Sequence, residues 1–185
     1  MSLSVSTPFS ADYEERLILK SADGESVAWR NARKVYRDGK GRKRDEFQLI
    51  VPQGLKDISV LIQATPPKVV VIDLATGRVL PREELSEQAP QASGRSQLIG
   101  HRQPEQGNPK RSMLGARTIE GVECQGQSLA YEDGVREFWW PLSLDLGQPI
   151  LDRSLTQTEA FERRFFNIRI GEPDPALFAP LDLSQ

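Results

Sequence analysis

Hydrophobic and polar residues along this chain alternate in short runs, and few segments follow a helical period. Runs such as "DYEERLILK" (residues 12–20), "DISVLIQA" (57–64) and "ERRFFNIRI" (162–170) are separated by Gly, Asp and Pro, a pattern typical of antiparallel strands. The helix candidates are short, namely "PREELSEQ" near residue 84 and "DPALF" near the C-terminal end. We therefore predict a mainly β, antiparallel fold of about ten strands with one or two short helices.

One predicted hairpin, "VYRDGKGRKRDEF" (residues 35–47), combines many basic residues with two glycines. Opposite charges across an antiparallel ladder stabilise it and like charges destabilise it, by roughly 0.2–1 kcal/mol per pair. A two-residue loop would place Arg33 against Arg44, so charge pairing favours the four-residue loop Asp38–Gly41. That register pairs Lys34 with Asp45, Arg33 with Glu46, Ala32 with Phe47 and Trp29 with Ile50.

In this register Lys40, Arg42 and Lys43 crowd the tip of the hairpin. Two interpretations stay open for them: a turn that stands in solvent, or a contact site for an anion such as a headgroup or polyanion. The stretch lacks regularly spaced aromatic residues, which argues against a platform for stacking nucleic-acid bases.

Aromatic residues supply a second set of candidates. In the strand predicted around "FWW" (138–140), Trp139 points away from Phe138 and Trp140. We expect Trp140 to pack in the core and Trp139 to be exposed or to face a ligand. The candidate ligand-lining residues are Trp29, Phe47, Ile50, Trp139 and Trp140.

Composition limits the class of protein. The chain has 185 residues, 38% hydrophobic and 27% charged, with a net charge of −2, which suits a globular domain and argues against a nucleic-acid binder. We expect one β domain over residues 8–182 behind a disordered start at 1–7, with the polar segment 86–112 as a mobile loop or lid. No apolar run reaches the length that spans a bilayer, and no leader is expected within this sequence.

The residues that carry enzyme chemistry are sparse. Cys124 is the single cysteine, which excludes a disulfide framework and a cysteine-based zinc site, and we expect a buried, inert thiol. His101 is the single histidine and lies in a polar run, so a Ser-His-Asp arrangement is not expected. Adjacent carboxylates at Glu14-Glu15 and Glu83-Glu84 point to opposite faces of a strand. We predict a protein that is not an enzyme and needs no cofactor or metal, with a hydrolase built on carboxylates alone left open.

Four segments in order carry a resemblance. "PFSADYEER" (8–16), "VYRDGKGRKRDE" (35–46), "LGARTIEGVECQG" (114–126) and "FFNIRIGEPDPALF" (165–178) resemble a family of uncharacterised secreted proteins of environmental Gram-negative bacteria. That family has the pattern PFSAD, YRDxxGRxRRE, TIEGV and GEPDPxLF, usually behind an exporting leader. Cys124 departs from it, since a small residue is usual there. The resemblance implies a periplasmic or secreted protein, with "MSLSVST" as a replacement start.

The strand-rich pattern is in turn similar to the lipoprotein-carrier (LolA-like) superfamily, an open antiparallel half-barrel whose concave face holds an acyl chain or docks a partner. This resemblance implies a monomeric, non-enzymatic binding protein of the cell envelope that shelters a lipid, an acyl chain or a lipoprotein segment. The alternative is an interaction or sensory domain that engages an envelope protein through sheet edges or residues 86–112. We expect Leu177 and Phe178 to plug one end of the barrel.

Overall fold

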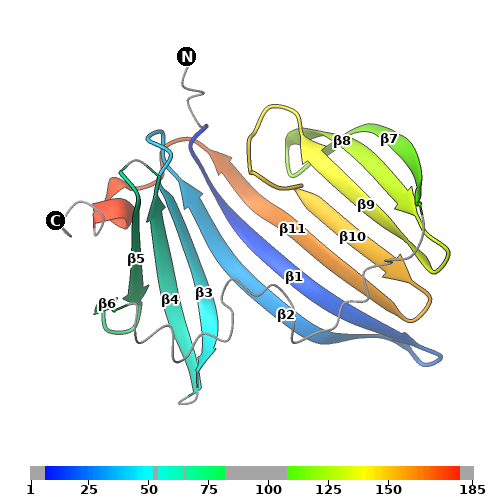
Figure 1. Ribbon diagram of the computed structural model, residues 1–185, viewed down its shortest axis with the longest axis horizontal. Helices are drawn as coiled ribbons and strands as arrows, with labels where there is room; N and C mark the ends of the chain where they lie inside the picture. Colours follow the sequence, from blue (N-terminus) through cyan, green and yellow to red (C-terminus); the bar gives the residue numbers. More distant parts are fainter. Residues whose placement is uncertain (1–6, 52–53, 65, 82–107, 180–185) are drawn as a thin grey trace. The chain divides into compact units, whose positions relative to one another are not determined.

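The structure is a computed structural model that describes residues 7–51, 54–64, 66–81 and 108–179 (Figure 1). Nearly all of its regular structure is β, which confirms the predicted class, and "DPALF" contributes one short 3-10 helix, η1 (Pro175–Phe178). The strands are β1 (Phe9–Ser21), β2 (Gly24–Arg37), β3 (Lys43–Val51), β4 (Gly54–Gln63), β5 (Lys68–Asp73), β6 (Val79–Leu80), β7 (Lys110–Ile119), β8 (Val122–Ala130), β9 (Gly134–Pro141), β10 (Leu151–Thr156) and β11 (Glu159–Ile170).

The strands form one antiparallel sheet in the order β6-β5-β4-β3-β2-β1-β11-β10-β9-β8-β7. Every neighbouring pair is also consecutive along the chain except β1 and β11, which bring the two ends of the sequence together. The terminal strands of the order, β6 and β7, are not neighbours, so the sheet of the described residues is open and does not close into a barrel. Short hairpin connections explain this order, because sequential antiparallel strands need only a tight turn between them.

Two compact units divide the chain. The first unit comprises residues 1–11, 33–101 and 169–185, and the second unit comprises residues 12–32 and 102–168. Strands β3 to β6 and helix η1 belong to the first unit, whereas β7 to β10 belong to the second. The long strands β1, β2 and β11 contribute residues to both.

The hairpin between β2 and β3 differs by one residue from its predicted register. Arg37 lies opposite Lys43 and Arg33 opposite Phe47, so the loop is the five residues Asp38–Arg42 and the predicted pairs are wrong. Asp38 decides the loop length, because its carboxylate accepts hydrogen bonds from the backbone N–H groups of Lys40 and Arg42 at 3.0 and 2.8 Å. These bonds, together with the ion pair to the Arg42 guanidinium at 2.6 Å, outweigh the small cross-strand charge terms.

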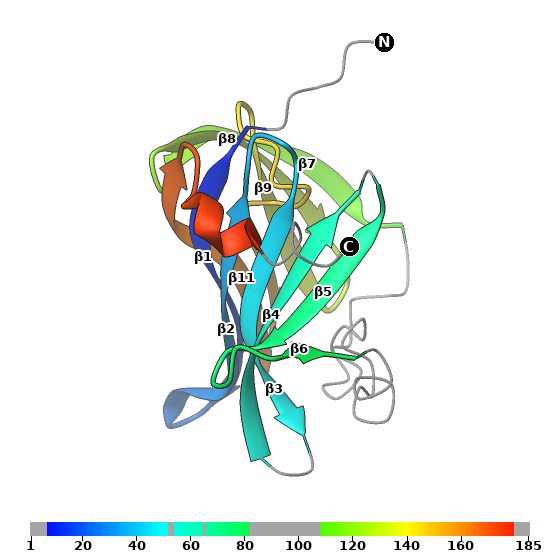
Figure 2. The ribbon, with the colours of Figure 1, turned by 90° about the vertical axis from the view of Figure 1, so that its left-hand side faces the viewer.

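The core of the first unit contains the predicted C-terminal plug residue. Phe178 of η1 is completely buried against Leu61, Val70 and Ile72 of β4 and β5, with Leu177 packed at the edge of the cluster. Figure 2 shows η1 beside these strands. Asp174 begins the helix by accepting the N–H of Ala176 at 2.9 Å. The burial that we predicted for Phe178 is therefore confirmed.

The second unit is held by aromatic packing and by close approach at glycine. The rings of Tyr13 and Phe165 lie 4.9 Å apart between centroids. Gly126 of β8 lies opposite Trp139 of β9, and the indole ring covers the place that a side chain would fill. Cys124 is free and buried, as predicted, and burial raises the pKa of its thiol.

Several predictions fall on residues outside those described. The helix candidate near residue 84, His101 and most of the predicted loop 86–112 belong to this set. The end of that segment is described, and here the prediction is wrong, because Lys110, Arg111 and Ser112 already form the start of β7. Among the described residues, no helix is long and apolar enough to cross a membrane.

Candidate functional site

The predicted ligand-lining aromatic residues are divided between the units. Trp29, Trp139 and Trp140 lie in the second unit, whereas Phe47 and Ile50 lie on β3 of the first. Trp139 is 6% exposed and Trp140 is 46% exposed, so their expected roles are reversed. The register of β8 and β9 is the reason, because it places the Trp139 ring over Gly126, which has no side chain to compete for the space.

The three predicted anion-contacting residues differ in their exposure to solvent. Lys40 and Lys43 are exposed, as expected for a hairpin tip, but Arg42 is buried, and the prediction of a solvated side chain is wrong for it. Its guanidinium pairs with the Asp38 carboxylate and stacks over the Phe178 ring at 5.0 Å from the centroid. Arg42 thus joins the hairpin to η1 and has a structural role.

Strands β4 and β5 carry apolar residues on both faces of the sheet. Helix η1 packs on one face, the face of Leu61 and Val70. The opposite face, which we call the Ile58 face, is formed by alternate residues of β4 and their neighbours on β3, β5 and β6. Its members are Ile58, Val60 and Ile62 of β4, Val69 and Val71 of β5, Phe47 of β3 and Leu80 of β6.

Burial decreases across the Ile58 face from one end to the other. Ile58, Val71 and Leu80 form a buried cluster against which Phe47 and Val60 pack. Ile62 and Val69, which lie directly opposite each other on β4 and β5, are exposed aliphatic side chains. The face therefore has a closed apolar end and an open apolar margin, and exposed Lys43 lies opposite Ile62 at that margin.

Two carboxyl groups interrupt the Ile58 face, those of Asp73, which lies opposite Ile58, and of Asp45. Asp45 lies opposite Val60 on one side and Val35 on the other. Burial raises the pKa of Asp45, although the nearby charges of Arg33 and Lys43 work in the opposite direction. Sequence reasoning missed this environment because the predicted register gave Asp45 the neighbour Lys34.

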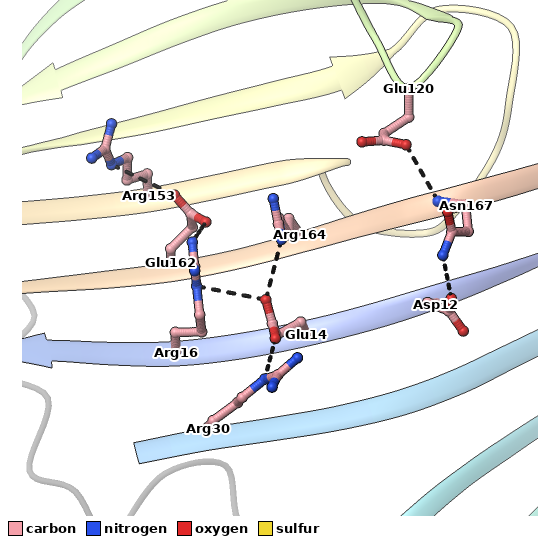
Figure 3. A network of polar contacts seen from close by, with 9 residues as sticks. All are labelled: Asp12, Glu14, Arg16, Arg30, Glu120, Arg153, Glu162, Arg164 and Asn167. Atoms are coloured by element: carbon pink, nitrogen blue, oxygen red, sulfur yellow. Dashed lines mark hydrogen bonds and ion pairs between the residues drawn. The ribbon is translucent and has the colours of Figure 1, made fainter. Parts of the chain in front are cut away.

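A cluster of charged side chains lies on β1, β2, β10 and β11 of the second unit (Figure 3). We call it the Glu14 cluster. The Glu14 carboxylate, whose side chain is 3% exposed, pairs with the guanidinium groups of Arg30 on β2 and Arg164 on β11, the latter at 3.4 Å. Arg16 of β1 lies 3.6 Å from the same carboxylate and also binds Glu162 of β11.

The outer members of the cluster are less buried than its centre. Arg153 on β10 reaches Glu162 at 3.8 Å. At the other end of Figure 3, the Asn167 side-chain amide donates to Asp12 at 2.7 Å, and the Asn167 backbone N–H donates to Glu120 at 3.3 Å. The carboxylates of Asp12 and Glu120 are thus engaged by an amide, whereas those of Glu14 and Glu162 are engaged by arginines.

The neighbouring carboxylates of Glu14 and Glu15 confirm the alternation expected of a strand. Glu15 accepts hydrogen bonds from Arg163 at 3.1 Å and from Asn31 at 3.3 Å. Neither of these two donors belongs to the Glu14 cluster. Two adjacent carboxylates therefore serve different networks. No group of three or more His, Cys, Asp or Glu side chains that could hold a metal occurs in the part of the chain that the structure describes.

No family model and no curated protein matches the chain. Solved structures that match include a chain of the Pseudomonas aeruginosa MucA/MucB complex, with TM-score 0.43 and 10% identity over 93% of this chain and 55% of that chain. They also include a LolA superfamily protein from Nitrosomonas europaea, with TM-score 0.33 and 12% identity over 95% of this chain and 91% of that chain. A third is a DUF1329 family protein from Desulfovibrio piger, with TM-score 0.35 and 10% identity over 95% of this chain and 90% of that chain. The chain thus spans about half the length of the MucA/MucB chain it matches. At these TM-scores the likenesses define no family and carry no conclusion about function.

Proposed function

We propose that this protein is a non-enzymatic binding protein of the cell envelope that shelters the acyl chain of a lipid or lipoprotein on the Ile58 face. One observation carries the proposal: β4 and β5 are apolar on both faces, and the face opposite η1 ends in the exposed pair Ile62 and Val69. The envelope location rests on the sequence resemblance of residues 8–178 to secreted proteins.

The exposed margin of the Ile58 face suits an acyl chain in its size and chemistry. Each methylene group that leaves water on such a surface contributes about 0.8 kcal/mol. Ile62 and Val69 would contact the chain, and Val60 would extend the contact toward the buried cluster. Lys43, opposite Ile62, is placed to attract an anionic headgroup. An amphiphile with an apolar tail and a negative head therefore matches both properties of the margin.

Titration of a fluorescent fatty acid, combined with native mass spectrometry of the purified protein, tests this proposal. Val69→Asp places a charge in the margin and should weaken probe binding at least about tenfold, because a desolvated charge opposes apolar contact. Val79→Asp is the matched control: Val79 is also an exposed valine, 51% against 65% for Val69, but it lies opposite Ile72 and so on the other face. A clean apo mass without saturable probe binding, or equal losses in both variants, would reject the acyl site.

A second candidate function is capture of an extended partner segment by strand β7. This terminal strand of the described sheet is ten residues long, and its side chains from Lys110 to Thr118 are exposed. It carries Lys110, Arg111 and Arg117 and no acidic residue, so it favours an acidic segment that adds as a further strand. An acidic peptide alternating Asp and Val should perturb the amide resonances of β7, and Arg111→Glu should abolish the effect. Perturbation that is absent, or that persists in the variant, removes this candidate.

A further inference from the structure

The charge balance around Glu14 points to a site that is separate from the Ile58 face. Glu14 supplies one carboxylate to three guanidinium groups, those of Arg16, Arg30 and Arg164. Arg16 is shared with Glu162, which also pairs with Arg153, so these four guanidinium groups and two carboxylates carry an excess of two positive charges. The two other carboxylates of the cluster, Asp12 and Glu120, lie at its edge and are bound by Asn167.

The exposure of the individual groups shows from which side a ligand could approach. The Glu14 side chain is 3% exposed and therefore lies beneath the arginines, whereas Arg30 is 64% and Arg164 41% exposed. The two arginines extend from β2 and β11, the strands on either side of β1, and so flank Glu14 from opposite directions (Figure 3). A ligand above Glu14 would meet positive groups on two sides.

The arginines also keep hydrogen-bond donors for such a ligand. Arg30 contacts Glu14 through Nε, so its Nη1 and Nη2 groups have no protein partner among the described residues. Arg164 contacts Glu14 through one terminal nitrogen only. A guanidinium group presents five N–H donors in a planar fork that matches the oxygen atoms of carboxylates and phosphates. Arg30 and Arg164 thus offer terminal N–H groups on two sides of a buried carboxylate, while the Nε of Arg164 is itself buried.

We propose that Arg30 and Arg164, supported by Arg16, form a binding site for a phosphomonoester group. The charge of such a group at neutral pH, about −1.5 to −2, matches the two excess positive charges, and its three terminal oxygens can accept from both forks at once. A single carboxylate would neutralise only half of the excess. The nearest further acid on the same face of β1, Asp12, is bound to Asn167.

Nuclear magnetic resonance of the arginine Nε–Hε groups tests the site directly, with methyl phosphate as the soluble probe at about 0.15 M salt. Saturable shifts of the Arg30 and Arg164 signals are expected. Arg30→Gln should weaken binding about ten- to hundredfold, since it removes a charge-assisted bidentate contact. Arg30→Lys keeps the positive charge but not the planar set of donors, and it should weaken binding of methyl phosphate by an intermediate factor. It replaces Arg30→Gln as the test variant if Arg30→Gln fails to fold.

The controls separate a built site from diffuse attraction. Arg111→Gln removes an exposed arginine of β7 in the same unit and should leave the affinity for methyl phosphate unchanged. Acetate should bind at least about tenfold more weakly than methyl phosphate, because it carries one charge and two oxygens. Absence of saturable shifts, equal affinity for acetate, or equal weakening by Arg111→Gln and Arg30→Gln would overturn the proposal.

A vesicle experiment distinguishes the two sources of a phosphomonoester. Phosphatidylcholine vesicles with and without phosphatidic acid present the same chemical group on a lipid surface. Binding that requires phosphatidic acid and is lost in Arg30→Gln assigns the site to a lipid headgroup, whereas binding of methyl phosphate alone assigns it to a free ligand. Both outcomes support the site, and neither depends on the acyl proposal, since Val69→Asp lies in the first unit and should leave methyl phosphate binding unchanged.

Discussion

Replacing Phe178 by alanine should strongly destabilise the first unit. The side chain is completely buried among Leu61, Val70 and Ile72, and truncation of a buried phenylalanine costs about 3–5 kcal/mol. The upper part of that range is expected here, because the Arg42 guanidinium stacks on the same ring and would lose a contact worth about 0.5–2 kcal/mol. For a chain of this length the melting temperature should fall by about 6–20 °C.

Urea unfolding followed by far-ultraviolet circular dichroism measures this loss. Phe178→Leu preserves most of the apolar volume and should cost less than about 1.5 kcal/mol. Leu177→Ala, on the same helix but at the edge of the cluster, should cost less than Phe178→Ala. Tryptophan emission gives a separate readout, since Trp29, Trp139 and Trp140 all belong to the second unit. An unfolding midpoint for Phe178→Ala that equals that of the unmodified protein would refute the packing argument.

Three further results are expected from the described contacts. Burial raises the pKa of Asp45 above its ordinary value of 3.8. The folded protein therefore keeps its full free energy of unfolding below pH 3.8, where Asp45 is protonated, and loses part of it as the pH rises through the raised pKa. Asp45→Asn should therefore raise the urea midpoint near pH 7 but not near pH 3, and a pH-independent effect would contradict this cause. In Gly126→Ala, the new methyl group would lie 2.6 Å from the Trp139 ring, which should cost about 1–3 kcal/mol and shift the tryptophan emission; unchanged emission and stability would exclude the clash. The Cys124 thiol should react with a disulfide reagent only after unfolding in urea, and labelling of the folded protein at the rate of a free thiol would show that it is accessible.

The elements that were predictable are those encoded by local pattern. Alternation of apolar and polar residues located the strands, and the chemistry of "DPALF" located η1. At the β1–β2 turn, Gly24 adopts a positive φ of 126°, a backbone conformation that favours glycine. The strand rule also separated Glu14 from Glu15 correctly. In each case the information lies within a few residues, where backbone sterics and turn chemistry act.

The candidate sites were less accessible to sequence reasoning. The ligand-lining candidates were chosen for aromatic character, but the exposed margin of the Ile58 face consists of the aliphatic residues Ile62 and Val69. The Glu14 cluster was missed because Arg30 and Arg164 are far from Glu14 in sequence and meet only through the pairing of β1 with β2 and β11. The strands contain more arginine than lysine, which could have indicated a site of this kind, but this composition does not say which residues of neighbouring strands lie opposite each other.

Local alternation and turn residues were enough to specify an antiparallel, strand-rich chain with a buried cysteine and a C-terminal aromatic anchor. Register and the partners of each side chain depended on the assembled sheet. The Asp38 carboxylate set the β2–β3 hairpin one residue away from the arrangement that charge pairing favoured, and Gly126 drew Trp139 inward while Trp140 turned to solvent. The physical reason is that each cross-strand pair contributes only about 0.2–1 kcal/mol, so a few hydrogen bonds or one close-packed ring can decide between neighbouring registers.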